Sequence, residues 1–399
     1  MEPDSGGRNR GAHGANATPA SGATSETRAR RVRRIAVRGV LLVAIVLAVG
    51  EFAARVTHFV DRVNPFPRHL YVATEVPDLP YRLRPGVSLD VHGARVDVNA
   101  LGMRDRAETT REPAPGTQRV VVVGDSVAFG WRQDVDRAFA RRLEEELAAK
   151  RAGKPGRVEV LNGGVPGYNA VNEAAWFREF GAALAPETVL VAVNLNDFDR
   201  APHLNGLGVL STDDADRQSA LSPGNWSELY LAYRWLALLA KGDPRLAAEA
   251  PAASATPDGA AGAAGSGAPQ ASPSGAWHPF DRYVSNLRKR FYRAPTEPEW
   301  GNLERAWRDL ATRARERGSR LVFLLFPDGD QVGVADPDLT PQQRLLELCA
   351  ANGFECLDLT PAFRAEATAS GAPLHSDIMH PNDAGHALAA RTVADYLTR

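Results

Sequence analysis

From residue 119 onward, five short apolar runs alternate with segments of helical periodicity, and this alternation restricts the fold more than any other feature of the chain. Continuous apolar runs are typical of strands that are buried on both faces of a parallel sheet. The helical segments between them would form right-handed crossovers. We therefore predict an α/β fold, a three-layer α/β/α sandwich with a five-stranded parallel sheet, whose strands cover residues 120–124, 158–161, 188–193, 320–326 and 354–358.

The N-terminal segment joins a basic arm to an apolar run. Residues 1–38 carry eight Arg and three acidic residues, whereas residues 39–50 carry no charge. A bilayer span usually needs about 20 apolar residues. A helix over residues 35–56 reaches that length, because side chains near its ends can extend to the headgroups. We predict a single transmembrane anchor over 35–56 that follows a disordered basic tail over 1–34.

The sidedness of this anchor follows from its arginines. Basic residues stay on the cytoplasmic side of a membrane, so the chain after the anchor is expected outside the cytoplasm, attached to the cytoplasmic (inner) membrane. A cleavable signal peptide is the alternative, since Ala48 and Gly50 satisfy the small-residue rule for cleavage. In that case the mature protein would be secreted.

The rest of the chain divides into a lead-in and a main domain. Residues 57–118 are expected to form a small β-containing lead-in, in which 89–98 alternate as a half-buried strand does. Residues 119–399 form the sheet domain. A flexible insert is predicted at about 244–279, because 23 of the 26 residues in 251–276 are Ala, Gly, Pro or Ser. Helical segments at 229–241 and 280–291 would cap the domain around it.

Charge and cysteine content exclude several classes of protein. The formal net charge is −1, so no electrostatic attraction to nucleic acid is expected. Two cysteines, Cys349 and Cys356, are too few for a disulfide-rich scaffold or a cysteine-based zinc cluster. Whether these two form a disulfide in an oxidising compartment stays open.

Candidate site residues follow three of the five predicted strands, and a fourth group lies near the C-terminus. Active sites of open parallel sheets lie at the carboxyl ends of the strands. Ser126 follows the first strand, Gly164 the second and Asn196 the third. Asp377 stands three residues before His380, close enough in a tight turn for the carboxylate to hold one ring nitrogen.

These residues lie in four ordered blocks that resemble the SGNH/GDSL hydrolase superfamily. The blocks are Gly-Asp-Ser126, Asn-x-Gly164-x-x-Gly, Asn196-Asp and Asp377-x-x-His380. The stretches 99–104 and 124–131 also resemble membrane-anchored bacterial members. One departure concerns the third block, which usually begins with Gly and here begins with Asn194.

The resemblance implies the flavodoxin-like SGNH fold and a serine hydrolase mechanism. Ser126 would attack an ester carbonyl, His380 would take its proton, and Asp377 would orient the imidazole. The oxyanion hole would consist of the backbone N–H groups of Ser126 and Gly164 with the side-chain amide of Asn196. No cofactor and no metal are implied. Asp125 and Asp197 are expected to hold the loops.

Other interpretations of the same residues are weaker. The glycines 163, 164 and 167 resemble a dinucleotide fingerprint, but Pro166 and the absence of an acid for the ribose argue against it. His375, Asp377 and His380 could bind a metal ion, but no second cluster supports that. The chain has no Gly-x-Ser-x-Gly elbow of the other common serine-hydrolase fold.

We therefore expect an extracytoplasmic serine esterase that acts on small acyl groups, O-acetyl above all, of a cell-surface glycan. One alternative is an O-acetyltransferase of an exopolysaccharide or cell-wall glycan, for which a membrane-bound acyltransferase would be a partner. The other is a non-catalytic glycan-binding or scaffold protein of the envelope. The sequence does not select the acyl group, the glycan or the oligomeric state.

Overall fold

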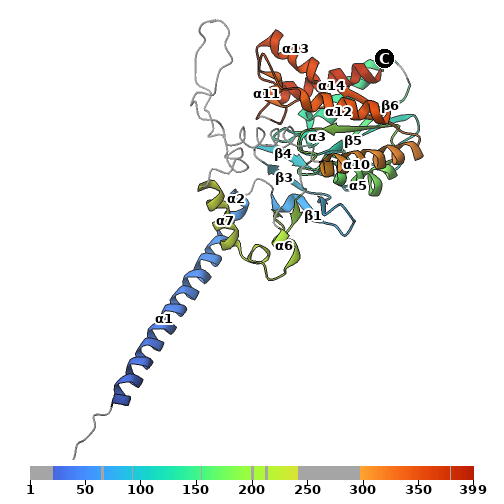
Figure 1. Ribbon diagram of the computed structural model, residues 1–399. Helices are drawn as coiled ribbons and strands as arrows, with labels where there is room; N and C mark the ends of the chain where they lie inside the picture. Colours follow the sequence, from blue (N-terminus) through green and yellow to red (C-terminus); the bar gives the residue numbers. More distant parts are fainter. Residues whose placement is uncertain are drawn as a thin grey trace, which may run out of the picture. The chain divides into compact units, whose positions relative to one another are not determined.

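The five apolar runs form a single parallel sheet in the computed structural model (Figure 1). The strands are β5 Thr117–Gly124, β6 Arg157–Asn162, β7 Thr188–Val193, β10 Arg320–Leu325 and β11 Glu355–Asp358. They lie in the order β11-β10-β7-β5-β6. This flavodoxin-like order reverses between β5 and β7, and such sheets hold their ligands outside the carboxyl ends of the strands at that point. The predicted α/β fold with a five-stranded parallel sheet is confirmed.

Helices cover both faces of the sheet because its strands are apolar on both sides. Along β5, Val121 and Val123 enter one core, while Val120 and Val122 enter the other. The first core is closed by α5 Ala170–Glu179, α10 Glu297–Glu316 and α12 Thr340–Asn352. The second is closed by α4 Phe139–Lys150, α13 Thr360–Ser370 and α14 Asp383–Leu397.

The structure describes residues 21–63, 67–91, 93–153, 155–198, 202–211, 214–240, 297–377 and 379–399. The predicted insert at 244–279 and the cap segment at 280–291 lie outside the described residues, as do residues 1–20. By its contacts the chain divides into two units, Met1–Val56 and Thr57–Arg399.

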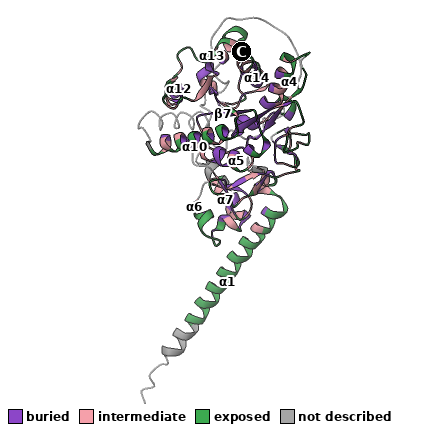
Figure 2. Cartoon of the chain, turned by 90° about the vertical axis from the view of Figure 1, so that its right-hand side faces the viewer, coloured by how far each residue is buried: buried purple, intermediate pink, exposed green. Residues whose placement is uncertain are grey.

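The N-terminal unit contains one long helix, α1 Ser21–Val56. It begins within the stretch 1–34 for which disorder was expected. The stretch Arg28–Val56 contains an 18-residue window with a mean hydropathy of 2.3 and no buried residue, and Figure 2 shows most of this stretch exposed. The helix is long and apolar enough to cross a membrane. A signal sequence and a single anchor both have these properties.

The lead-in forms two hairpins. Strand β1 Tyr71–Ala73 pairs with β2 Tyr81–Leu83, and β3 Ser88–Val91 pairs with β4 Ala94–Asp97, both antiparallel. The expectation of one strand over 89–98 is therefore wrong. The chain reverses between Val91 and Ala94, where Gly93 has φ of 82°. Val91 and Ala94 stand opposite each other and are both buried, so the alternation of apolar and polar residues shifts by one position across the turn, and this shift was the available signal of the reversal.

A small outlying subdomain follows α1 and β7. It contains α2 Phe59–Val63, η1 Arg68–Leu70, β8 His203–Leu204, β9 Leu210–Ser211, α6 Asp214–Gln218, η4 Pro223–Asn225 and α7 Glu228–Ala240. Helix α7 corresponds to the helix expected over 229–241. It packs against α2, where Val60, Val209 and Leu231 form a separate small core. The remaining short helices lie in loops of the main domain: α3 Ser126–Phe129, η2 Val135–Arg137, η3 Gly181–Leu184 and α11 Gly329–Val332.

The two cysteines form a disulfide. Cys349 at the end of α12 is bonded to Cys356 in β11, with the two Cα atoms 6.3 Å apart, a separation typical of disulfides. The bond ties α12 to the edge strand of the sheet.

Candidate active site

Loops at one edge of the sheet bring the predicted site residues together. Ser126 begins α3 directly after β5, and the Asp377 to His380 turn lies between α13 and α14. The Oγ of Ser126 is 2.8 Å from the Nε2 of His380, although the two residues are 254 positions apart. The parallel topology therefore supplies this contact, because it places the loop after β5 beside the C-terminal loop.

The Asp377 carboxylate fixes the tautomer of His380. The Nδ1 of His380 lies 2.8 Å from Oδ2 and 3.0 Å from Oδ1 of Asp377. An ionised carboxylate only accepts hydrogen bonds, so Nδ1 carries the proton and donates. In the neutral ring, Nε2 is then left as the acceptor for the Ser126 hydroxyl. This is the arrangement in which an imidazole can activate a serine.

Asp377 is itself held by its own turn. Its Oδ1 accepts hydrogen bonds from the backbone N–H groups of Met379 at 2.9 Å and His380 at 2.8 Å. Burial raises the pKa of Asp377. The His380 ring and these backbone donors together lower it by more, so the pKa lies well below its usual range. The carboxylate is therefore ionised throughout the neutral pH range.

The pKa of His380 reflects opposing influences. Burial lowers it, whereas the charges of Asp377 and Asp125 raise it. The guanidinium of Arg132 lowers it, and its Nη1 is 4.0 Å from the Oδ2 of Asp377. The carboxylates prevail, and the pKa of His380 lies above its ordinary value.

Asp125 links the nucleophile loop to the loop after β7. Its buried carboxylate accepts hydrogen bonds from the N–H of Val127 at 2.8 Å and from the Nδ2 of Asn196 at 2.6 Å. The Ser126 hydroxyl is 3.3 Å from this carboxylate, farther than from His380. Burial raises the pKa of Asp125 more than these bonds lower it. The structural function expected for Asp125 agrees with this geometry.

The three predicted oxyanion donors gather around the start of α3. Asn196 is held beside Ser126 through Asp125. Gly164 lies against α3 so closely that a Cβ would be 2.3 Å from the backbone nitrogen of Phe129. Only glycine fits so close to the backbone of α3. The Oδ1 of Asn162 accepts the hydrogen bond of the Gly164 N–H at 3.0 Å.

The third block keeps its turn despite Asn194. The side chain of Asn194 accepts a hydrogen bond from the N–H of Asn196 at 3.0 Å. The Oδ2 of Asp197 accepts one from the N–H of Asn194 at 3.1 Å, in agreement with the structural function expected for Asp197. The replacement of the usual glycine thus adds a bond within the loop that presents Asn196.

Sequence reasoning overlooked two buried charged residues near the site. Arg104 has a relative exposure of 1% and donates to backbone carbonyls of the loop after α3. Glu173 in α5 is fully buried, and burial, followed by the charge of Asp125, raises its pKa well above the usual range. The sequence did contain signals for both residues. Arg104 is the last residue of the stretch 99–104, which resembles other family members, and Glu173 is an acidic residue close to Ala and aromatic residues.

The other histidines near the site point elsewhere. The Nε2 of His375 lies 3.0 Å from the carbonyl oxygen of Pro327, and burial lowers the pKa of His375 to about 4. His386 is buried within α14, and burial lowers its pKa to about 3. Over the part of the chain that the structure describes, no three His, Cys, Asp or Glu residues are grouped as a metal site would need.

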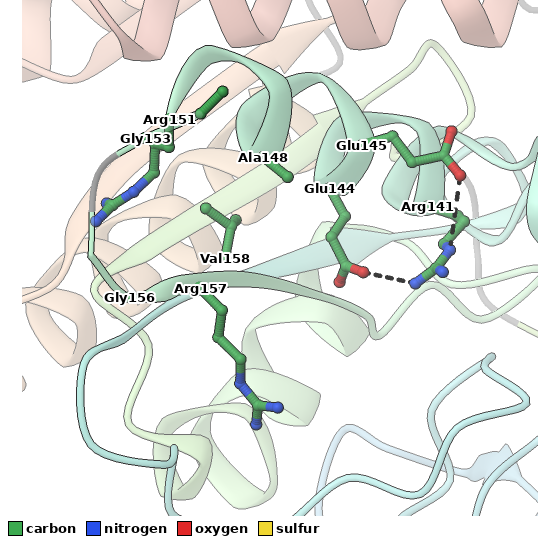
Figure 3. A pocket seen from close by; sticks show the side chains of 10 residues that line it. Arg141, Glu144, Glu145, Ala148, Arg151, Gly153, Gly156, Arg157 and Val158 are labelled. Carbon is green, nitrogen blue, oxygen red and sulfur yellow. Dashed lines mark hydrogen bonds and ion pairs between the residues drawn. The ribbon is translucent and has the colours of Figure 1, made fainter.

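A cavity of about 460 Å³ lies away from this edge, between α4 and β6 (Figure 3). It is lined by charged side chains that pair with one another, such as Arg141 with Glu144 and Glu145. It contains none of the predicted site residues. We assign it no function.

Comparisons with known proteins agree with the fold. Residues 122–388 match the model of the GDSL-like Lipase/Acylhydrolase family. No curated protein sequence matches the chain. Among solved structures, the chain is similar to the acetyl xylan esterase AlAXEase, with 12% identity and a TM-score of 0.38 over 70% of this chain and 98% of that one.

Two further structures are similar to the same extent. One is a two-domain esterase active on acetylated mannans, with 12% identity and a TM-score of 0.38 over 71% of this chain and 49% of that one. The other is a mutant of Axe2, an acetyl-xylooligosaccharide esterase from Geobacillus Stearmophilus, with 11% identity and a TM-score of 0.38 over 71% of this chain and 94% of that one. The resemblance in each case concerns the fold.

Proposed function

Since this chain belongs to the GDSL-like Lipase/Acylhydrolase family and is an esterase of that kind, we propose that it removes small acyl groups, O-acetyl above all, from a cell-surface glycan outside the cytoplasm. The observation that carries the catalytic part of the proposal is the continuous hydrogen-bond chain from Ser126 through His380 to Asp377. A non-catalytic scaffold would have no need of this alignment.

The proposed reaction has two steps. His380 removes the hydroxyl proton of Ser126 through Nε2 while Oγ attacks the ester carbonyl, and it then returns the proton to the departing alcohol. Water repeats the sequence on the acyl-enzyme and releases the free acid. Asp377 remains ionised and stabilises the imidazolium that forms in each step.

Charge that develops on the carbonyl oxygen would be stabilised by hydrogen-bond donors around α3. We assign this function to the N–H groups of Ser126 and Gly164 and to the second amide hydrogen of Asn196. The N–H of Gly164 donates to the Oδ1 of Asn162 in the free enzyme and would share that hydrogen with the oxyanion. The first amide hydrogen of Asn196 donates to Asp125, which holds the group in place. A donor fixed in this way before the reaction stabilises the transition state without reorganisation.

Replacing Asn196 with alanine is expected to lower kcat by about 10²- to 10³-fold, the usual effect of losing one such donor. KM should change little, because the donor acts on charge that exists only in the transition state. Steady-state kinetics on a soluble acetate ester would measure both constants. Asn302→Ala, an exposed position on α10, is the matched control, and an Asn196→Ala enzyme with normal kcat would contradict the assignment.

The activity should rise with pH through the pKa of His380. Only the neutral imidazole accepts the Ser126 proton, and the pKa of His380 lies above the ordinary value of 6.5. The acidic limb of kcat/KM is therefore expected to have its midpoint above pH 6.5. The rate of inactivation by a fluorophosphonate should follow the same curve, since it needs the same base. An acidic limb near pH 5 would be inconsistent with this pairing.

We further propose that α1 is an uncleaved anchor with its N-terminus in the cytoplasm. The cluster of Arg before the apolar run supports this orientation. The Cys349–Cys356 disulfide supports an oxidising compartment for the main domain. N-terminal sequencing of the membrane fraction tests the anchor: a mature chain that begins after residue 50 would identify a signal peptide instead.

The substrate class follows from this location, where polysaccharides and their acyl groups are within reach of an anchored enzyme. The test is a series of esters of increasing acyl length together with acetylated polysaccharides, followed by assay of free acetate. We expect the acetyl ester to be preferred and acetate to be released. A preference for long acyl chains would point to lipids, and transfer of acetate to added sugar in place of release would identify a transferase.

A further inference from the structure

Helix α7 is apolar on two opposite faces. On the face toward the small core, Leu231 and Ala232 are buried. The opposite face carries a row at helical spacing, which we call the α7 stripe: Leu229, Tyr230, Tyr233 and Leu236. Tyr233 is 65% exposed and Leu236 is 54% exposed. A surface helix normally carries polar residues on its outer face.

Two more large apolar residues, just before the helix in the chain, are exposed as well. Leu221 is 85% exposed and Trp226 is 55% exposed, and the indole N–H of Trp226 donates to the carbonyl of Leu221. Contiguous exposed apolar surface on a soluble domain indicates a site that contacts another molecule or a membrane.

The charged residues of α7 hold the helix in place. One of them, Arg234, also lies over the ring of Tyr230, 5.8 Å from its centroid, so Tyr233 and Leu236 are the exposed part of the stripe. Glu228 is buried and pairs with Arg68, which also pairs with Asp61 of α2. Arg234 pairs with Asp216. The helix is thus bound through its charged residues to the subdomain, and in particular to α2.

The sequence position of α2 indicates what the stripe meets. Phe59 begins α2 three residues after Val56 ends α1, and three residues of extended chain span only about 10 Å. If α1 crosses the bilayer, α2 and the α7 packed on it are therefore held near the membrane surface. Trp and Tyr mixed with Leu is the composition that proteins place at the headgroup level of a membrane.

We infer that the α7 stripe, together with Trp226, inserts into the headgroup region of the membrane that α1 anchors. This inference rests on the proposed anchor and not on the esterase chemistry. Its partner is a lipid surface. The contact would fix the main domain against the membrane by two attachments, the α1 helix and the α7 stripe.

The test uses the full chain in phosphatidylcholine vesicles, with a polarity-sensitive fluorophore on a single introduced cysteine. Both natural cysteines are in the disulfide, so the new thiol is the one that reacts. The test position is Tyr233→Cys. The control is Leu346→Cys, on α12, which lies away from α7 in Figures 1 and 2. A third label, Val43→Cys, reports on α1.

At position 233 we expect a blue-shifted emission and at least twofold quenching when the lipids carry bromine near the headgroup. The label at 346 should show neither. Lipids brominated deep in the acyl chain report on position 43. Quenching at 43 by these lipids without quenching at 233 by headgroup bromine overturns the inference and leaves the anchor intact, whereas absence of quenching at 43 removes the anchor and the inference together. Esterase activity of each labelled chain shows that it is folded, and it reports on the proposed function separately.

Other occupants of the stripe give different results at position 233. A blue shift that brominated lipid does not quench means that protein covers the stripe. If that shift grows with the protein-to-lipid ratio, the cover is a second copy of the chain. Either result overturns the inference.

Discussion

Replacing Ser126 with alanine is expected to abolish ester hydrolysis, with kcat reduced by about 10⁴-fold or more, as for other serine hydrolases that lose the nucleophile. The structure gives the reason, because the Ser126 hydroxyl lies 2.8 Å from the Nε2 of His380, the nitrogen that would accept its proton. Reaction with a serine-directed fluorophosphonate should be lost as well. Initial rates on an aryl acetate and fluorescent labelling measure the two effects.

The control for this experiment is Ser370→Ala. Ser370 lies at the exposed end of α13, and its hydroxyl donates to the carbonyl of Glu366. This variant should keep full activity and full labelling. A Ser126→Ala enzyme that retains one part in a hundred of the activity, or that still reacts with the fluorophosphonate, would overturn the assignment of the nucleophile.

Replacing Arg104 with leucine is expected to lower the free energy of unfolding by about 3 kcal/mol or more. The Nη1 of Arg104 donates to the carbonyls of Phe129 and Gly130, and the Nη2 donates to that of Gln133. Its guanidinium also lies over the Phe129 ring, 4.3 Å from the centroid. Leucine would leave buried carbonyl oxygens without donors, at about 1 to 3 kcal/mol for each.

The change should appear as a fall in the thermal unfolding midpoint of about 4 °C or more. Activity should fall too, because the same loop carries Trp131, whose ring centroid is 6.4 Å from that of His380. Arg106→Leu is the matched control, since Arg106 is half-exposed and pairs with Asp97 and Asp136 at the surface. Exposed pairs contribute at most about 1 kcal/mol. Equal destabilisation by both changes would contradict the argument.

The sequence was sufficient to predict the sheet because parallel strands buried on both faces must be apolar throughout. The run at 188–193 matches β7 at both ends, and the others differ by a few residues. The pairing of Ser126 with His380 and Asp377 was predicted from the resemblance to the family, and in the structure Ser126 lies within hydrogen-bond distance of His380, as His380 does of Asp377.

The features that could not be predicted depend on contacts between distant segments. Nothing local to Arg104 indicates that it will meet carbonyls some 25 to 29 positions along the chain. The reversal between Val91 and Ala94 was overlooked because each arm of the hairpin alternates by itself, although the alternation shifts by one position from one arm to the other. The bond from Gly164 to Asn162 was not foreseen either, although the two residues are neighbours in one block.

The turn that carries Asp377 and His380 has a consequence for how the enzyme can be switched off. Acid and base are joined by backbone as well as side-chain bonds within four residues, whereas the bond to Ser126 crosses between separate loops. A displacement of this turn would therefore carry the pair away as one body. In such a form the imidazole of His380 would stay oriented by Asp377 but would no longer contact the Ser126 hydroxyl. The active arrangement would form again when the turn returned to its position.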